Sequence, residues 1–398
     1  MTWRLGLIAG EPSGDLIAAK ALAGLKLIDP QVRPEGIGGP HLAAAGLDIW
    51  HPMHALSVFG YVDAIKRFPS LVRIYSDVKN RWLREPPAVF LGVDAPDFNL
   101  RLEHRLRREG VPTIHFVGPS IWAWRYERIH YIREAVSHML VLFPFEQAIY
   151  EKEGIPVTYV GHPMADAIPI EPNQFAARER LGLNQQARIV AILPGSRASE
   201  IKLLAPRFLQ AAQLLQKTDP TLQFVVPMVN VHRAKEFEEY LKQFPVKNIR
   251  TVMAQEQAIG IADPIAWSVL EACDVALVAS GTATLETALF KKPMVISYAV
   301  SPLVRKVMAW KSGQQRPYLP WVGLPNVLLN DFAVPELIQE DATPDNLARE
   351  ISSLLRDEQR CERIRIRFTE LHHTLRCNTP VRVAQAIESV IQQQRSST

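Results

Sequence analysis

The feature that most constrains the fold is the alternation of short apolar runs with longer helical patterns along most of the chain. Short runs that are apolar throughout are typical of parallel strands, because helices cover both faces of such a sheet. We therefore predict a doubly wound α/β architecture. The expected strands are at residues 5–9, 89–92, 113–117, 138–142 and 158–160, and then at 189–193, 223–226, 275–278 and 293–297.

The chain has 398 residues, more than the ~100–200 of a usual domain. Residues 162–173 are rich in proline, and Pro163, Pro169 and Pro172 exclude a continuous helix there. We therefore predict two Rossmann-like domains with a ligand cleft at the carboxyl ends of their strands. The expected boundaries are 1–165, 166–345 and, for helices that cover a domain surface, 346–398.

Composition narrows the class of protein. The sequence is 47% hydrophobic and 22% charged, as in a globular protein, and none of its apolar runs approaches the ~18–20 residues of a membrane span. The start at Met1 leads directly into a strand without room for a leader, which predicts a cytoplasmic protein. Cys273, Cys361 and Cys377 lack metal-ligand spacing and are interpreted as packing residues.

Net charge alone does not identify a partner. A value of +4 suits anionic lipid, nucleic acid or a phosphorylated substrate. The sequence contains no zinc-finger pattern, RNP-type strand or dense basic tract, so we expect no nucleic-acid partner.

A glycine-containing loop follows the first expected strand and opens a helix. It contains Glu11, Ser13, Gly14 and Asp15. Unpaired N–H groups and the positive end of the helix dipole meet at such a place, which favours an anion or a polar sugar. The loop has neither the P-loop lysine nor the dinucleotide glycine spacing, so neither ATP nor NAD is indicated. The alternative is an ordinary turn capped by Ser13 or Asp15.

The second half carries a comparable loop at Gly195, Ser196 and Arg197, after the strand at 189–193. A guanidinium beside a helix N-terminus suits a diphosphate, because it supplies planar bidentate donors to a site that is already positive. The alternative is a surface arginine in a turn.

A third loop contains Ser280, Gly281 and Thr282, with Glu286 one turn into the following helix. Small residues let a ligand approach the backbone amides, and a carboxylate at this position can bridge the two hydroxyls of a ribose. Together with the arginine loop, this pattern predicts a nucleotide-sugar site.

Asp94 follows the apolar strand at 89–92. A sugar hydroxyl that attacks an anomeric carbon needs a group to accept its proton, and Asp94 is the candidate general base. The alternative is that Asp94 and Asp97 cap the next helix, an interpretation that we favour for Asp97.

Seven motifs resemble the lipid-A-disaccharide synthase family and occur in the same order. Any one of them could arise in another α/β enzyme, but the ordered set covers the chain from end to end. The motifs are Gly10-Glu11-Pro12-Ser13-Gly14-Asp15, Asp94-Ala95-Pro96-Asp97-Phe98-Asn99, Pro119-Ser120-Ile121-Trp122-Ala123-Trp124-Arg125, Gly161-His162-Pro163, Pro194-Gly195-Ser196-Arg197, Ser280-Gly281-Thr282 and Leu324-Pro325-Asn326.

This resemblance implies a GT-B enzyme of glycosyltransferase family 19. Such enzymes join UDP-2,3-diacylglucosamine to 2,3-diacylglucosamine 1-phosphate with inversion, and they release UDP and a β-1,6-linked disaccharide phosphate. They use no metal or organic cofactor, and this sequence lacks the Asp-X-Asp pair of metal-dependent transferases.

The resemblance also implies roles for individual residues. Asp94 deprotonates the acceptor 6-hydroxyl, Arg197 and nearby backbone amides stabilise the leaving UDP, and Glu286 holds the ribose. His162 is expected to fix the hinge rather than to act as a base. The remaining donor-site residues are Gly195, Ser196, Ser280, Gly281, Thr282, Asn326, Glu336 and Gln339, and the acceptor or sugar-positioning residues are Glu11, Ser13, Gly14, Asp15, Asn99, Trp122, Trp124 and Arg125. For the tryptophans, burial in a domain core is the alternative.

Acylated substrates require contact with a bilayer. Apolar residues recur at near-helical spacing between 62 and 75 and alternate with basic ones, which suits an anionic membrane surface. The alternative is that they pack on the sheet. The predicted contacts are Val62, Ile65, Phe68, Leu71 and Val72, and a similar cluster at 303–311 is a second candidate contact or a lid.

We thus expect a bacterial cytoplasmic enzyme bound peripherally to the inner membrane, with a homo-oligomer left open. The rival functions are a GT-B transferase or UDP-sugar epimerase that acts on a soluble sugar, and a non-catalytic nucleotide-sugar or lipid-binding protein.

Overall fold

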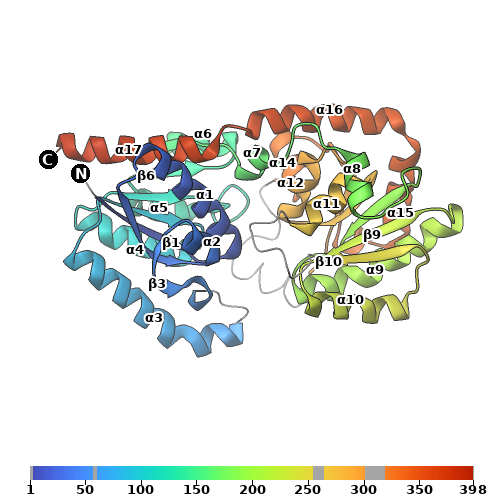
Figure 1. Ribbon diagram of the computed structural model, residues 1–398, viewed down its shortest axis with the longest axis horizontal. Helices are drawn as coiled ribbons and strands as arrows, with labels where there is room; N and C mark the ends of the chain where they lie inside the picture. Colours follow the sequence, from blue (N-terminus) through green and yellow to red (C-terminus); the bar gives the residue numbers. More distant parts are fainter. Residues whose placement is uncertain (1–2, 57–60, 254–263, 301–318, 398) are drawn as a thin grey trace. The chain divides into compact units, whose positions relative to one another are not determined.

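The computed structural model describes residues 3–56, 61–253, 264–300 and 319–397, with only the backbone of 61–68 and 397 (Figure 1). The chain divides into two units. The first comprises Met1–Asp166 with Leu375–Thr398, and the second comprises Ala167–Thr374. Each is a parallel sheet covered by helices, so the predicted α/β class is confirmed.

In the first unit, the described strands form one sheet in the order β3-β2-β1-β4-β5-β6-β7. Its core strand β1 is buried along Leu5–Ala9 because helices cover both faces. The strands are β1 (Trp3–Ala9), β2 (Val32–Gly38), β3 (Asp48–Pro52), β4 (Val89–Val93), β5 (Thr113–Phe116), β6 (His138–Val141) and β7 (Val157–Tyr159).

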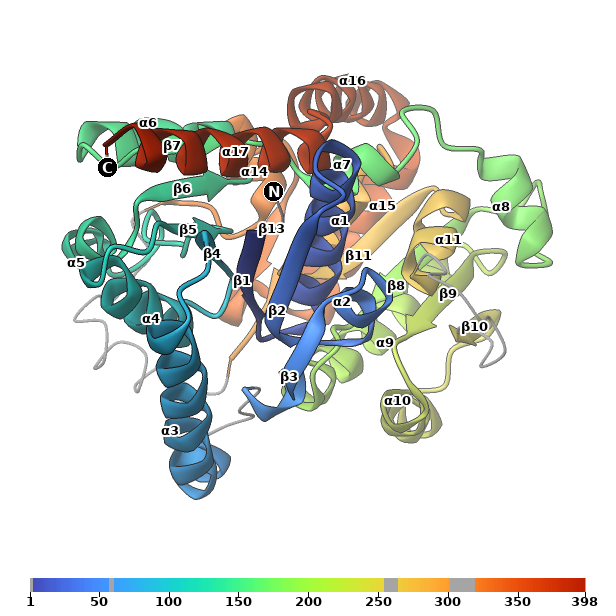
Figure 2. The same cartoon turned by 60° about the vertical axis from the view of Figure 1, so that its left-hand side comes forward.

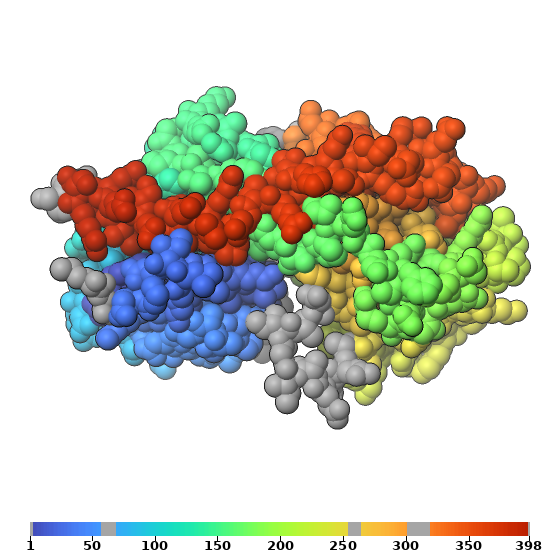
Figure 3. All heavy atoms as spheres, turned by 45° about the horizontal axis from the view of Figure 1, so that its top comes forward, coloured from blue at the N-terminus to red at the C-terminus, as the bar shows by residue number. Residues whose placement is uncertain are grey.

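The helices of the first unit include the last helix of the chain, α17 (Thr379–Ser397). It packs along α1, and Figure 3 shows it in red against the blue N-terminal elements. Gly24 of α1 permits this contact, since a Cβ there would lie 2.6 Å from the Pro380 carbonyl oxygen. The other helices are α1 (Pro12–Ile28), α2 (Pro40–Ala44), α3 (Tyr61–Arg84), α4 (Pro96–Arg108), α5 (Ile129–Ala135), α6 (Pro144–Lys152) and α7 (Pro163–Ala167), with 3-10 turns at Met53–Ala55 and Tyr126–Arg128.

In the second unit, the described strands follow the order β10-β9-β8-β11-β12-β13. They are β8 (Ile189–Leu193), β9 (Gln223–Met228), β10 (Ile249–Met253), β11 (Val275–Ala279), β12 (Met294–Tyr298) and β13 (Glu336–Ile338). The helices are α8 (Gln174–Arg180), α9 (Ala198–Thr218), α10 (Val231–Gln243), α11 (Ile265–Ala272), α12 (Thr282–Leu289), α14 (Leu324–Leu329), α15 (Pro344–Arg356) and α16 (Glu358–Leu375), with a 3-10 turn at Gln339–Asp341.

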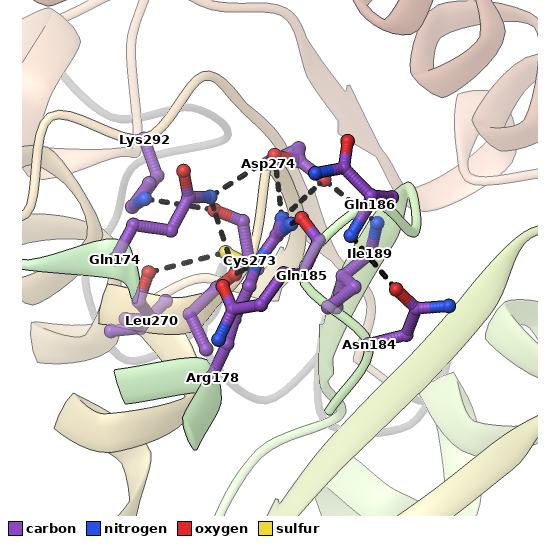
Figure 4. Close-up of polar contacts among 11 residues, drawn as sticks. Gln174, Arg178, Asn184, Gln185, Gln186, Ile189, Leu270, Cys273, Asp274 and Lys292 are labelled. Atoms are coloured by element: carbon purple, nitrogen blue, oxygen red, sulfur yellow. Dashed lines mark hydrogen bonds and ion pairs between the residues drawn. The ribbon is translucent and has the colours of Figure 1, made fainter. Parts of the chain in front are cut away.

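An ion pair between the buried Arg178 and the partly exposed Asp274 joins α8 to the start of β11 (Figure 4). The Arg178 guanidinium donates from Nη2 to both Asp274 carboxylate oxygens at 2.9 Å and from Nε to the Ala272 carbonyl oxygen at 2.9 Å. Cys273 beside it is fully buried, and burial raises the pKa of its thiol to about 11. The thiol is therefore a packing group, as predicted from the sequence.

Candidate functional site

Two loops meet at the carboxyl edge of the first sheet because β1 and β4 are neighbours, with Ala9 paired to Val93. A Cβ added to Gly14 would lie 3.6 Å from the Asp94 Cβ, and one added to Gly10 would lie 3.0 Å from the Ala95 Cβ. The fold thus brings the glycine-containing loop and the candidate base together.

Asp94 occupies a strained turn. Its φ is 53° and that of Ala95 is 44°, a left-handed pair that costs non-glycine residues roughly 1–3 kcal/mol each. The turn is held from both sides. The Asp94 N–H donates to the Phe116 carbonyl at 2.9 Å, and the Asn99 side-chain amide donates to the Asp94 carbonyl at 2.8 Å. Strain maintained in this way is typical of a functional position.

Asn99 is fully buried, and its amide also donates to the Val93 carbonyl at 3.3 Å. In this structure the Asn99 amide group therefore holds the turn, and the predicted contact between Asn99 and the sugar stays a prediction. Asp97 differs from its predicted capping role. The N-cap of α4 is Ala95, and the Asp97 carboxylate accepts from Arg128 at 2.6 Å.

Glu11 is the N-cap of α1, and its side chain makes no capping hydrogen bond to the first turn of this helix. Ser13 and Glu11 are exposed there. Asp15 departs from both readings of the sequence. It is fully buried, and its carboxylate accepts from the backbone amides of Gly39 at 2.7 Å and His41 at 2.9 Å, at the start of α2. Asp15 therefore anchors α2 to α1, and its predicted role in positioning the sugar stays a prediction.

The tryptophan segment follows β5. Trp122 is half-buried and meets Phe145 edge-on at 5.3 Å between ring centroids. Trp124 is half-buried, while Arg125 is exposed in a left-handed conformation with its Nε 3.7 Å from Glu127. Only Arg125 in this group presents a charge to solvent.

His162 is buried and stacks on Phe143 at 5.8 Å between ring centroids. Its Nδ1 accepts from the Met164 N–H at 3.2 Å, and burial lowers the pKa of the ring to about 4. A buried imidazole that stays neutral in this way is a structural group, in agreement with our choice against a base.

In the second unit, the loop after β8 is closed by Glu200. Its carboxylate accepts from the amides of Ser196 at 2.9 Å and Arg197 at 3.1 Å. The Ser196 amide thus has a partner within the chain, and its predicted use for the leaving group stays a prediction. Gly195, with φ 108°, is required because a Cβ there would lie 2.4 Å from Glu200 Oε2. The Arg197 guanidinium is 75% exposed and only loosely paired with Glu200, at 3.8 Å.

The loop after β11 shares this sheet edge, since β11 pairs with β8. The Ser280 amide donates to the Ser297 carbonyl at 2.9 Å, so the sheet, and not a ligand, uses it. Gly281, with φ 138°, and Thr282 are exposed where α12 begins, and no described side chain caps that helix. Burial raises the pKa of Glu286 one turn later. The first turn of α12 thus starts at the same sheet edge as the arginine loop, and no described side chain caps it.

The three remaining donor-site candidates stabilise one loop. Asn326 is fully buried, and its side-chain amide donates to Glu336 Oε1 and the Val334 carbonyl, both at 2.8 Å. Glu336 also accepts from the Gly323 amide at 2.9 Å, and Gln339 Oε1 accepts weakly from the Val300 amide at 3.4 Å. The polar atoms of Asn326 and Glu336 thus bind each other and the backbone, and the predicted direct contacts with the donor stay a prediction.

The predicted membrane residues are only partly described. Leu71 is half-buried and Val72 is 47% exposed on α3. The side chains of Val62, Ile65 and Phe68 and the whole cluster at 303–311 lie outside the described residues. The capping role of Glu200 at the start of α9 was not predicted, although a glutamate three residues after the N-cap is the capping-box spacing.

Comparisons with known proteins agree with the motif order. A family model described as lipid-A-disaccharide synthetase matches residues 5–387. A lipid-A-disaccharide synthase of Bordetella petrii is 65% identical over 390 residues, covering 98% of this chain and 99% of its own. One from Paraburkholderia phytofirmans is 47% identical over 393 residues, covering 98% and 97%.

Solved structures of low sequence identity resemble this chain in fold alone. A UDP-N-acetylglucosamine 2-epimerase from Listeria monocytogenes, described as putative, matches with a TM-score of 0.66 at 11% identity, covering 100% of this chain and 98% of its own. The calicheamicin glycosyltransferase CalG4 matches with a TM-score of 0.61 at 13% identity, covering 99% of both chains. These are proteins of the predicted GT-B class.

Proposed function

The chain belongs to the lipid-A-disaccharide synthase family, and from this premise we propose that Asp94 is its catalytic base and that the loops after β8 and β11 hold the UDP. The protein is a hexosyltransferase of lipid A synthesis. The reaction condenses UDP-2,3-diacylglucosamine with 2,3-diacylglucosamine 1-phosphate to give the β-1,6-linked disaccharide 1-phosphate and UDP.

The observation that carries the assignment of the base is the strained turn at Asp94. The turn places a half-buried carboxylate at the sheet edge, beside the N-terminus of α1. Asp94 accepts the proton of the acceptor 6-hydroxyl while that oxygen attacks the anomeric carbon of the donor. The bond from this carbon to the UDP oxygen breaks on the opposite face, so the configuration inverts.

The acceptor contacts the loop from Gly10 to Gly14. Glu11 and Ser13 are exposed beside an uncapped helix terminus, which offers a carboxylate, a hydroxyl and backbone donors to sugar hydroxyls. Asn99 and Asp15 act indirectly, as positioning residues that hold the turn and the helix.

The leaving UDP carries negative charge that must be stabilised. Arg197 supplies an exposed guanidinium, and the α12 terminus at Thr282 supplies open backbone amides and a positive dipole end. Glu286, one turn into α12, accepts from the ribose hydroxyls. We assign the diphosphate to α12 instead of α9, because Glu200 already accepts from the Ser196 and Arg197 amides that lead into α9.

We also propose peripheral binding at the cytoplasmic face of the inner membrane. No helix within the described residues is long and apolar enough to cross a membrane. The exposed Val72 and Arg73 on α3 offer an apolar and a basic group side by side, which suits an anionic bilayer surface.

Incubation of the purified protein with both acylated substrates, followed by mass analysis, tests this function. We expect a disaccharide 1-phosphate and one equivalent of UDP. A parallel reaction with UDP-N-acetylglucosamine and glucosamine 1-phosphate, which lack the acyl chains, is the control. Folded protein that gives no disaccharide from the acylated pair, or that turns over the unacylated pair equally well, would contradict the proposal.

A further inference from the structure

A pocket of about 850 Å³ lies within the first unit, beside the Asp94 turn. This is within the ~300–1,000 Å³ of typical ligand pockets. It lies among α3, α4 and α5, which pack against one another in this order (Figure 2). Its lining begins at Gly10, Ala95 and Pro96 and reaches His104, which is about 12 Å further along α4.

The lining of this pocket is mostly apolar. Leu71 and Tyr75 come from α3 and Phe98 from α4, and Tyr75 meets Phe98 edge-on at 5.8 Å. Tyr131 stacks on His104 at 5.5 Å. A well-formed apolar hollow that leads away from a proposed catalytic carboxylate is suited to an apolar part of the substrate.

The part of the rim that α4 forms further from the Asp94 turn is cationic, whereas Glu11 and Asp97 place two carboxylates in the lining near that turn. Arg101 and Arg105 are exposed on successive turns of α4 and both line the pocket. Arg105 is paired with Glu109 at 2.9 Å, whereas the structure gives Arg101 no carboxylate partner among the described residues. An apolar interior with a basic rim on α4 fits an amphiphile that has an acyl chain and an anionic head group.

We propose that this pocket binds an acyl chain of the acceptor and sets the acyl-chain length that the enzyme accepts. The inference rests on the proposed function, which places the acceptor hydroxyl at Asp94. Because the pocket begins at the Asp94 loop, a sugar bound there directs a neighbouring acyl chain between α3 and α4. Leu71, Tyr75 and Phe98 then form the wall that the chain meets.

The variant Leu71→Trp tests this by filling the pocket. Its matched control is Leu27→Trp on α1, where the native leucine is 83% exposed. The KM values of donor and acceptor are measured in mixed micelles, with acceptors of native chain length and with chains two carbons shorter. In the wild type, the shorter acceptor binds more weakly, by up to about fourfold for each buried methylene lost.

In Leu71→Trp, we expect the order to reverse. The KM of the native-length acceptor rises about tenfold, the shorter acceptor binds at least as well as the longer one, and the donor KM stays unchanged. Leu27→Trp keeps the wild-type values. A general folding defect lowers activity with both acceptors and does not reverse their order.

Three results would overturn the inference. The first is that Leu71→Trp raises the donor KM instead of the acceptor KM. The second is that both KM values of this variant stay at the wild-type level. The third is that only its binding to anionic vesicles changes, which would make Leu71 a membrane contact. If Leu71→Trp does not fold, Phe98→Ala enlarges the same pocket, and an unchanged chain-length preference in that variant would equally overturn it. Loss of turnover in Asp94→Ala tests the proposed function separately, because it is independent of chain length.

Discussion

Asn99 fixes the backbone of the turn that carries the proposed catalytic carboxylate, Asp94. Its amide holds the carbonyls of Asp94 and Val93. We expect Asn99→Ala to lower kcat about tenfold or more while the KM values change little, because the carboxylate shifts within the site and substrate contacts remain. The free energy of unfolding should also fall by about 1–3 kcal/mol.

Steady-state kinetics and urea unfolding check this prediction. Asn346→Ala is the matched control, since its amide also donates to a backbone carbonyl, that of Asp341, but in the second unit. A normal kcat in Asn99→Ala would remove Asn99 from its positioning role.

His162 makes the stability of the first unit dependent on pH. Burial lowers the pKa of its ring from 6.5 to about 4. The unfolded chain therefore binds more protons than the native one between these values, so stability is full above pH ~6.5 and is lost as pH falls towards 4. The shift corresponds to about 3 kcal/mol at most.

Urea unfolding between pH 4.5 and 7.5 measures this dependence. We expect His162→Asn to have a flatter profile, because the amide oxygen keeps an acceptor for the Met164 N–H but does not titrate. A variant profile as steep as that of the wild type would assign the acid sensitivity to another group.

At the scale of elements, Glu336 determines the path of the chain before α14. It accepts from the backbone amides of Val322 at 2.8 Å and Gly323 at 2.9 Å. Glu336→Gln places an N–H₂ group against one of its present donors, so we expect the free energy of unfolding to fall by about 1–3 kcal/mol. Glu370→Gln, at an exposed position on α16, is the control. A Glu336→Gln variant as stable as the control would return Glu336 to a role in direct donor contact.

The strands that the sequence predicts are those with continuous apolar runs, such as β8 and β11. β2 was missed because Arg33, Pro34 and Glu35 interrupt its pattern, and β13 because Glu336 leaves only two apolar residues in it. The loops at Asp94 and Arg197 were predictable, since each follows an apolar strand. The partners of Asp15 and Asn326 were not, because hydrogen bonds from Asp15 to Gly39 or from Asn326 to Glu336 join residues that meet only in the folded chain.

At the scale of the whole molecule, the proposed base and the proposed diphosphate ligand lie on different units. Asp94 belongs to the first unit and Arg197 to the second. Substitution of one should therefore leave the function of the other intact. The family assignment establishes the reaction. The proposed residue roles add that proton transfer and UDP binding depend on different units of the chain.

The most direct test is calorimetric titration of UDP into Asp94→Ala and Arg197→Ala, with turnover measured on the same samples. We predict that Asp94→Ala turns over about 10²–10⁴-fold more slowly than the wild type and binds UDP with the same affinity. Arg197→Ala should bind UDP about tenfold or more weakly, as expected for a lost charge-assisted contact. Near-normal turnover in Asp94→Ala, or loss of UDP binding together with turnover in that variant, would contradict the account.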